Sequence, residues 1–142
     1  MKKLICRLAA LPALLLLLNS CTSVPNEVAI DLKEEIFFKN AQDAMDENHY
    51  NLALYYYEVY LVRYPEIHNK TIAAEYERAL IYYKKKDYDY SKSLFEQVLD
   101  KYKTSPFAAM YPERYRILSE KILALIDEKQ NPKSKENTPE EV

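Results

Sequence analysis

The chain has 142 residues, a net charge of −2, fourteen tyrosines, and no glycine or tryptophan. A mildly acidic chain argues against a nucleic-acid-binding surface, and its length fits one domain. The absence of glycine excludes Gly-rich phosphate loops, nucleophile elbows and most tight hairpins.

Residues 1–20 have the pattern of a secretory signal peptide. Lys2, Lys3 and Arg7 form a basic start, and an apolar run of eleven residues follows at 8–18. This run is too short to span a bilayer, which needs about twenty residues. Without the three bases of this segment, the rest of the chain has a net charge of −5.

Cys21 directly follows that segment, in the sequence Leu18-Asn19-Ser20-Cys21. The tetrapeptide resembles the lipobox of bacterial lipoproteins, with Asn19 typical of its relaxed form in spirochaetes. The resemblance implies that Cys21 receives a diacylglyceryl group and becomes the N-terminus after cleavage. The alternative is an ordinary secretory signal followed by a chance cysteine. Because Cys6 would be removed, no thiol would remain for a disulfide, a metal or nucleophilic catalysis.

The remainder divides into three predicted parts. We expect residues 21–30 to be a tether from the lipid and residues 31–129 to be a helical domain. Residues 130–142 contain two prolines, several charges and almost nothing apolar. Such a segment cannot bury enough surface to order itself, so it is predicted to be a disordered tail.

Five segments of the domain have apolar residues at a helical period, namely 31–47, 50–63, 68–86, 88–102 and 112–128. Pro65 follows the second segment and ends it, and Pro106 lies just beyond the fourth. Pro112 suits the first turn of the fifth. The predicted fold class is therefore all-α.

The chain also matches itself at an offset of 38 residues, which indicates a repeat architecture. The aligned pairs include Ala41 with Ala79, Ala53 with Ser91, Tyr57 with Phe95, and Tyr64 with Tyr102.

In type and spacing, Ala41, Ala53, Tyr57 and Pro65 resemble a tetratricopeptide repeat. The resemblance implies helical hairpins in which small residues let two helices approach and Tyr57 fills the space between them. Asn48 replaces the usual glycine of the turn, and asparagine tolerates that backbone well. The implied architecture is two such repeats plus a C-terminal capping helix. The family period is 34, so a few extra residues are expected between the units, around 66–70.

Segments 41–45, 50–53, 57–58 and 63–65 are similar to the first repeat of BamD-type lipoproteins, subunits of the machinery that assembles outer-membrane β-barrels. The resemblance implies a lipid-anchored scaffold without cofactors, in the outer membrane and facing the periplasm. Its partners would be a barrel-assembly subunit or unfolded outer-membrane protein segments. That family usually has about five repeats, so this chain would be a short, spirochaete-type member. The alternatives are a secretin pilotin and a cell-division coordination lipoprotein.

The same resemblance implies a binding groove lined by the first helix of each repeat. The positions carried over are Glu35, Phe38, Gln42, Met45, Ala73, Tyr76, Leu80 and Tyr83. An aromatic, adaptable surface of this kind suits an extended or helical peptide. In the alternative arrangement, the last helix folds back and covers the groove.

Catalysis and metal binding have little support in the sequence. The chain has two histidines, His49 and His68, and neither has a nucleophile or ligand partner at a useful spacing. The run 84–86 of three lysines ends a predicted helix, where positive charge offsets the helix macrodipole. A binding role for this run is the alternative. We therefore expect a binding protein rather than an enzyme.

The lipid anchor gives the first prediction. Cys21→Ser should either leave the protein uncleaved or release it from the membrane, because acylation supplies most of its membrane affinity. Labelling cells with a tagged fatty acid measures the modification directly. Wild-type protein that takes up no label would refute the anchor.

Overall fold

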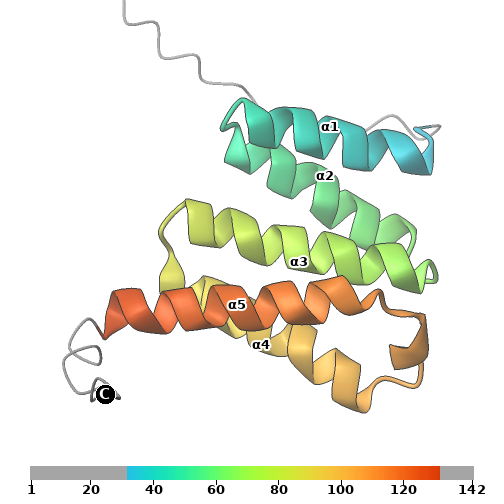
Figure 1. The fold of residues 1–142 in the computed structure, drawn as a ribbon. Helices are drawn as coiled ribbons and strands as arrows, with labels where there is room; N and C mark the ends of the chain where they lie inside the picture. Colours follow the sequence, from blue (N-terminus) through green and yellow to red (C-terminus); the bar gives the residue numbers. More distant parts are fainter. Residues whose placement is uncertain (1–31, 132–142) are drawn as a thin grey trace, which may run out of the picture.

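The computed structural model describes residues 32–131, and within that range the regular structure is entirely helical (Figure 1). The elements are α1 (Glu34–Asp46), α2 (Tyr50–Arg63), α3 (His68–Lys84), α4 (Tyr88–Thr104), the short 3-10 helix η1 (Ala108–Met110) and α5 (Glu113–Gln130). The all-α prediction is confirmed. The predicted signal peptide, Cys21, the tether and residues 132–142 of the predicted tail lie outside the described residues.

The predicted helix boundaries agree with the structure to within a few residues. The α1 helix begins three residues later than expected, and α4 and α5 each extend two residues further. The predicted tail is wrong at its first residue, because Gln130 is helical and its side-chain amide donates to Asp89 at 2.6 Å. Pro112 directly precedes α5 instead of lying in its first turn. The η1 helix was not predicted.

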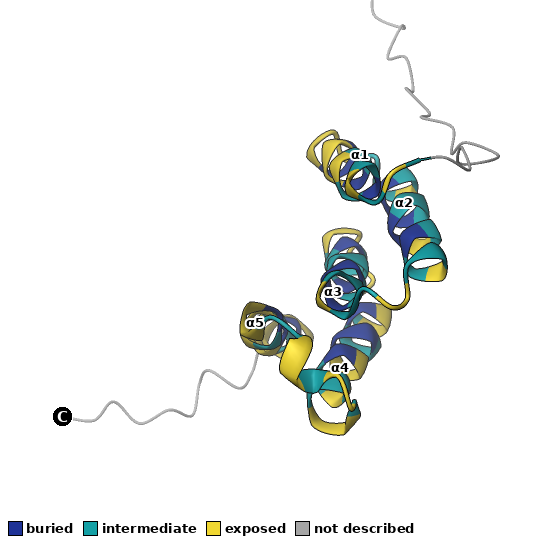
Figure 2. Cartoon of the chain, turned by 90° about the vertical axis from the view of Figure 1, so that its right-hand side faces the viewer, coloured by how far each residue is buried: buried dark blue, intermediate teal, exposed yellow. Residues whose placement is uncertain are grey.

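Successive helices run in opposite directions and form two layers. Figure 2 looks along the helices and shows α1, α3 and α5 in one layer and α2 and α4 in the other. The α1 helix packs on α2, and α3 packs on α4, so the chain forms two hairpins. The hairpins meet where α2 packs on α3, and α5 packs mainly on α4.

The turns that close the two hairpins share one backbone geometry. Asn48 and Lys86, which are 38 residues apart, have φ values of 60° and 64°. In each turn the following N–H donates to a carbonyl five residues earlier, at 2.8 Å from His49 to Ala44 and at 3.0 Å in the second turn. This Schellman arrangement favours glycine or asparagine at the left-handed position. The expectation for Asn48 is therefore confirmed. Lys86 adopts the same left-handed conformation, although its side chain cannot stabilise this conformation by a local hydrogen bond as that of asparagine can.

Small residues lie fully buried where the paired helices approach each other. Each of these side chains is 0% exposed: Ala41, Ala53, Ala79 and Ser91. The Ser91 hydroxyl donates to the carbonyl of Ala79 at 2.9 Å, so this buried polar group is satisfied. The aromatic residues Tyr57 and Phe95 are 1% and 0% exposed. These three aligned pairs thus have the same degree of burial in both hairpins.

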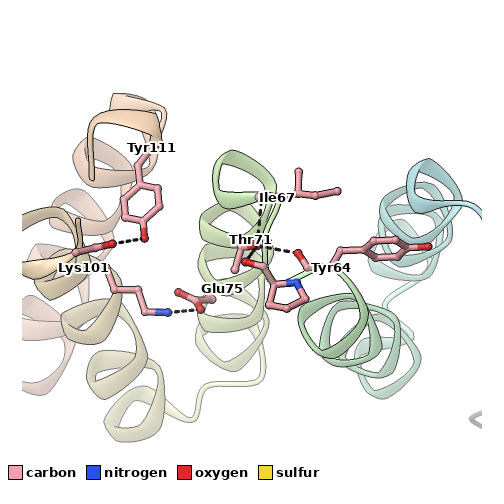
Figure 3. A network of polar contacts seen from close by, with 8 residues as sticks. Tyr64, Ile67, Thr71, Glu75, Lys101 and Tyr111 are labelled. Atoms are coloured by element: carbon pink, nitrogen blue, oxygen red, sulfur yellow. Dashed lines mark hydrogen bonds and ion pairs between the residues drawn. The ribbon is translucent and has the colours of Figure 1, made fainter. Parts of the chain in front are cut away.

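The extra residues expected around 66–70 become the first turn of α3. The starts of α1 and α3 are 34 residues apart, whereas the two hairpin turns are 38 apart. The α3 helix is therefore one turn longer than α1 at its N-terminal end. The Thr71 hydroxyl stabilises this turn by hydrogen bonds to the Tyr64 carbonyl at 3.2 Å and the Ile67 carbonyl at 3.0 Å (Figure 3).

The α3 helix is buried on two sides and joins both hydrophobic cores. It contributes Ala74 and Ile81 to the core of α1 and α2, and Ile72, Ala73, Tyr76 and Ala79 to the core of α4 and α5. Phe38 of α1 packs against both cores. An ion pair between Glu75 and Lys101 also links α3 to α4 (Figure 3). The two hairpins and α5 are thus packed together through α3.

Tyr57 and Phe95 should be of equal importance to the fold. Truncating either one to alanine should lower the free energy of unfolding by about 3–5 kcal/mol, a large share of the roughly 5–15 kcal/mol typical of a protein. Thermal denaturation measures the effect, with Glu58→Ala and Glu96→Ala as controls at the exposed positions next in sequence. If both aromatic variants melt within a few degrees of wild type, the repeat register is incorrect.

Candidate functional site

The residues predicted to line the groove belong to α1 and α3, on the face formed by α1, α3 and α5. We call this the α1–α3–α5 face (Figure 2). Glu35 and Gln42 are exposed, and Phe38, Leu80 and Tyr83 are half-buried. Met45, Ala73 and Tyr76 are buried, with exposed fractions of 5%, 5% and 6%. The predicted set is therefore only partly accessible.

Tyr76 is a core residue, which corrects the expectation that it lines an open surface. Its ring lies 5.6 Å from Phe95 and 5.3 Å from Tyr115 of α5. At this position α5 covers α3, as in the alternative left open by the sequence. Met45 needs the same correction, since it is part of the core of α1 and α2.

The half-buried members divide between the two cores. Phe38 lies edge-on to the rings of Tyr57 and Tyr60, at 5.5 and 4.8 Å. Leu80 and Tyr83 pack against the α4–α5 core, and the Tyr83 ring lies 5.6 Å from that of Tyr88. What remains accessible is Gln42, Glu35 and the outer sides of the half-buried residues.

Glu77 of α3 is a candidate residue that the sequence analysis missed. It is half-buried, and within residues 32–131 its carboxylate has neither a hydrogen bond nor an ion pair. Burial raises the pKa of this carboxyl group, and the positive charges of Lys84 and Arg114 offset only part of that effect. A desolvated carboxylate without a direct partner is typical of a functional site.

The Tyr57 hydroxyl shares this environment. It is fully buried and has no hydrogen-bond partner among the described residues. Burial raises the pKa of Tyr57, and the negative charge of Glu77 raises it further, so the hydroxyl keeps its proton. An unpaired buried hydroxyl costs about 1–3 kcal/mol of stability. The fold therefore contains a free hydrogen-bonding group next to a free carboxylate.

The α5 helix completes this group of residues with Arg114 and Tyr115. The Arg114 guanidinium donates to the Tyr115 hydroxyl at 2.6 Å. Burial raises the pKa of Tyr76 to about 12, with further contributions from Glu77 and Tyr115. We define the Glu77 cluster as Tyr57, Tyr76, Glu77, Lys84, Arg114 and Tyr115. It contains hydrogen-bond acceptors, hydrogen-bond donors and two cations.

One signal for Glu77 was present in the sequence. It lies four residues after Ala73 and three before Leu80, which places it on the helix stripe predicted to line the groove. Glu77 could therefore have been named as a candidate site residue from the sequence. Arg114 could not have been named in this way, because its place near Glu77 depends on where α5 packs.

The histidines take other roles. The His49 Nδ1 atom lies 3.0 Å from a Glu47 carboxylate oxygen, and the His68 ring stacks on Phe107 at 3.7 Å. In the part of the chain that the structure describes, no three His, Cys, Asp or Glu side chains are grouped so as to hold a metal ion. None of the helices described is long and apolar enough to cross a membrane.

Comparison with known proteins finds one distant relative. No protein-family model matches the chain, and no solved structure matches it. An uncharacterized protein of Treponema pallidum (strain Nichols) is 29% identical over 104 residues. The match covers 70% of this chain and 41% of the relative, so the chain spans less than half of that protein's length.

Replacing Glu77 should stabilise the fold in a pH-dependent way. Because the folded-state pKa is raised above the ordinary 4.5, ionisation of Glu77 reduces stability as the pH rises through and above that value. Glu77→Gln should therefore melt above wild type at neutral pH, and the difference should vanish below pH 4.5. Melting curves at both pH values measure this, with the exposed Glu58→Gln as control. An equal shift at both pH values would contradict the account of Glu77.

Proposed function

We propose that the protein is a lipid-anchored, protein-binding scaffold of the bacterial cell envelope, and that its α1–α3–α5 face binds a segment of a partner protein. The observation that carries the proposal is the Glu77 cluster. Native proteins leave few buried polar groups without partners, yet here the Tyr57 hydroxyl is buried without one, and the half-buried Glu77 carboxylate has no direct partner among the described residues. A bound segment that donates hydrogen bonds, such as an extended backbone or an amine, would satisfy the Glu77 carboxylate.

The architecture supports this proposal, and we infer that the two hairpins are tetratricopeptide-like repeats capped by α5. Three features recur at the offset of 38: the left-handed turn residue, the pair of small buried residues, and the buried aromatic residue. In such arrays the first helix of each repeat lines the binding surface. Here those helices are α1 and α3, which carry the accessible residues Gln42 and Leu80.

Within this class, the proposed role is an accessory subunit for outer-membrane β-barrel assembly. The likeness of residues 41–65 to BamD-type lipoproteins supports it, and the relative from Treponema, a spirochaete, agrees with the relaxed lipobox at Cys21. The partner would be a barrel-assembly subunit or an unfolded outer-membrane protein segment. A secretin pilotin or a division-coordination lipoprotein would use the same surface with a different partner.

Crosslinking in intact cells tests the binding face. A photoreactive residue at Gln42 should capture the partner, and mass spectrometry then identifies it. The same residue at Glu96, on the outward side of α4, is the matched control. Capture from Glu96 alone would place the binding surface elsewhere. Recovery of secretin or division proteins in place of barrel-assembly proteins would select the alternative role.

The Glu77 cluster should contribute to the affinity for that partner. Tyr57→Phe combined with Glu77→Gln keeps both shapes and removes the hydroxyl and the negative charge, so the fold should persist while capture weakens about tenfold, the loss expected for one charge-assisted hydrogen bond. Circular dichroism on the same sample checks the fold. A folded double variant that binds as strongly as wild type would show that the cluster has no part in recognition.

A further inference from the structure

Exposed apolar side chains gather at one end of the molecule. This end, which we call the Leu32 end, comprises the starts of α1, α3 and α5, the ends of α2 and α4, and η1; it lies to the right in Figure 1 and faces the viewer in Figure 2. Val62 is 81% exposed, Phe107 44% and Met110 56%. Ile117 and Leu118, in the second turn of α5, are also exposed. Of the six large apolar side chains exposed within residues 32–131, only Tyr90 lies toward the opposite end.

The segments that carry these side chains are held in place. Phe107 stacks on the His68 ring at 3.7 Å with an interplanar angle of 18°. Tyr111 shares a 2.9 Å hydrogen bond with Ser105, and the Tyr102 hydroxyl donates to the Pro112 carbonyl at 2.7 Å. Phe107 and Met110 are thus exposed on a connection between α4 and α5 that these contacts hold in place.

The chain from the proposed lipid site joins the domain at this same end. The Tyr64 hydroxyl donates to the Leu32 carbonyl at 3.3 Å, which fixes the first described residue beside the end of α2. Residues 22–31 separate Cys21 from Leu32. Even fully extended, a segment of this length reaches only about 35 Å. A lipid on Cys21 would therefore keep the domain within this distance of the bilayer, and the tether joins the domain at the Leu32 end.

The charge of this end is compatible with an anionic lipid surface. Glu34, Glu75 and Glu113 are ion-paired, with Lys70, Lys101 and Arg116 respectively. The exposed bases Lys33, Lys103 and Arg114 are matched in number by the exposed acids Glu35, Glu66 and Asp100, which have no ion pair among the described residues. The end therefore has no excess of acidic side chains that would repel anionic phospholipids.

We propose that the Leu32 end docks on the phospholipid surface, with Phe107, Met110 and Val62 entering the boundary between headgroups and acyl chains. The inference rests on the proposed lipid anchor at Cys21. Side chains of this kind insert into that boundary and add a second contact to a lipid anchor. Docking at this end directs the helices away from the membrane, so the α1–α3–α5 face points sideways and stays open to a partner.

A polarity-sensitive fluorophore tests the orientation of the lipidated full-length protein, reconstituted into vesicles of phosphatidylethanolamine and phosphatidylglycerol. After removal of Cys6 and acylation of Cys21, an introduced cysteine is the only free thiol. One reporter is placed at Val62→Cys, and the matched reporter at Asp46→Cys, an exposed position at the opposite end. The Val62 reporter should shift to the blue and be quenched by spin-labelled lipid, while the Asp46 reporter should show its emission in water.

The combined change Phe107→Ser and Met110→Ser should return the Val62 reporter toward its emission in water, with fatty-acid labelling and circular dichroism unchanged. Two reporters that both report water, or that are both quenched by lipid, would overturn the proposed docking. Either result leaves crosslinking at the α1–α3–α5 face unaffected, so it does not bear on the scaffold function. A chain that takes up no fatty acid would instead remove the anchor on which the inference rests.

Discussion

The packing of α3 on both sides is the constraint on which the rest of this structure depends. A helix with two buried faces must place small residues where the neighbouring helices approach, and α3 has Ala73, Ala74 and Ala79 at buried positions. The stripe between those two faces is narrow. Glu77 and Leu80 lie there and are half-buried because both sides of the helix are covered. The desolvation of Glu77 is therefore a consequence of how the two hairpins are joined.

The fourteen tyrosines compensate for two absences in the composition. The chain has no tryptophan, and on the proposed processing it would have no disulfide. Tyrosine buries a large ring and can still pair its hydroxyl at the edge of a core. Tyr60 donates to Glu34 at 3.2 Å, Tyr64 to the Leu32 carbonyl, and Tyr102 to the Pro112 carbonyl. These bonds join segments distant in sequence, so the tyrosines both fill the cores and hold the connections.

Tyr57 departs from this pattern, and the departure is informative. Its ring fills the first hairpin as Phe95 fills the second, yet its hydroxyl has no partner among the described residues. A phenylalanine would serve packing better, because it would leave no polar atom unpaired. Natural proteins break such local rules mainly at functional sites, where stability is traded for binding or chemistry. The same hydroxyl lies near Glu77, which also points to a role in the proposed site.

The sequence by itself determined the five helices, the hairpin turns and the buried small and aromatic residues. Helical period, turn residues and an internal repeat are local signals, and hairpin partners are neighbours along the chain, so Ala41, Asn48 and Tyr57 could be assigned without coordinates. Tertiary structure decided which groove residues stay accessible. Tyr76 is covered because α5 returns across α3, and Met45 is buried because α1 packs with that side on α2. The approach of Arg114 to Glu77 likewise depends on α5, whose position results from many weak contacts between segments that no local pattern links.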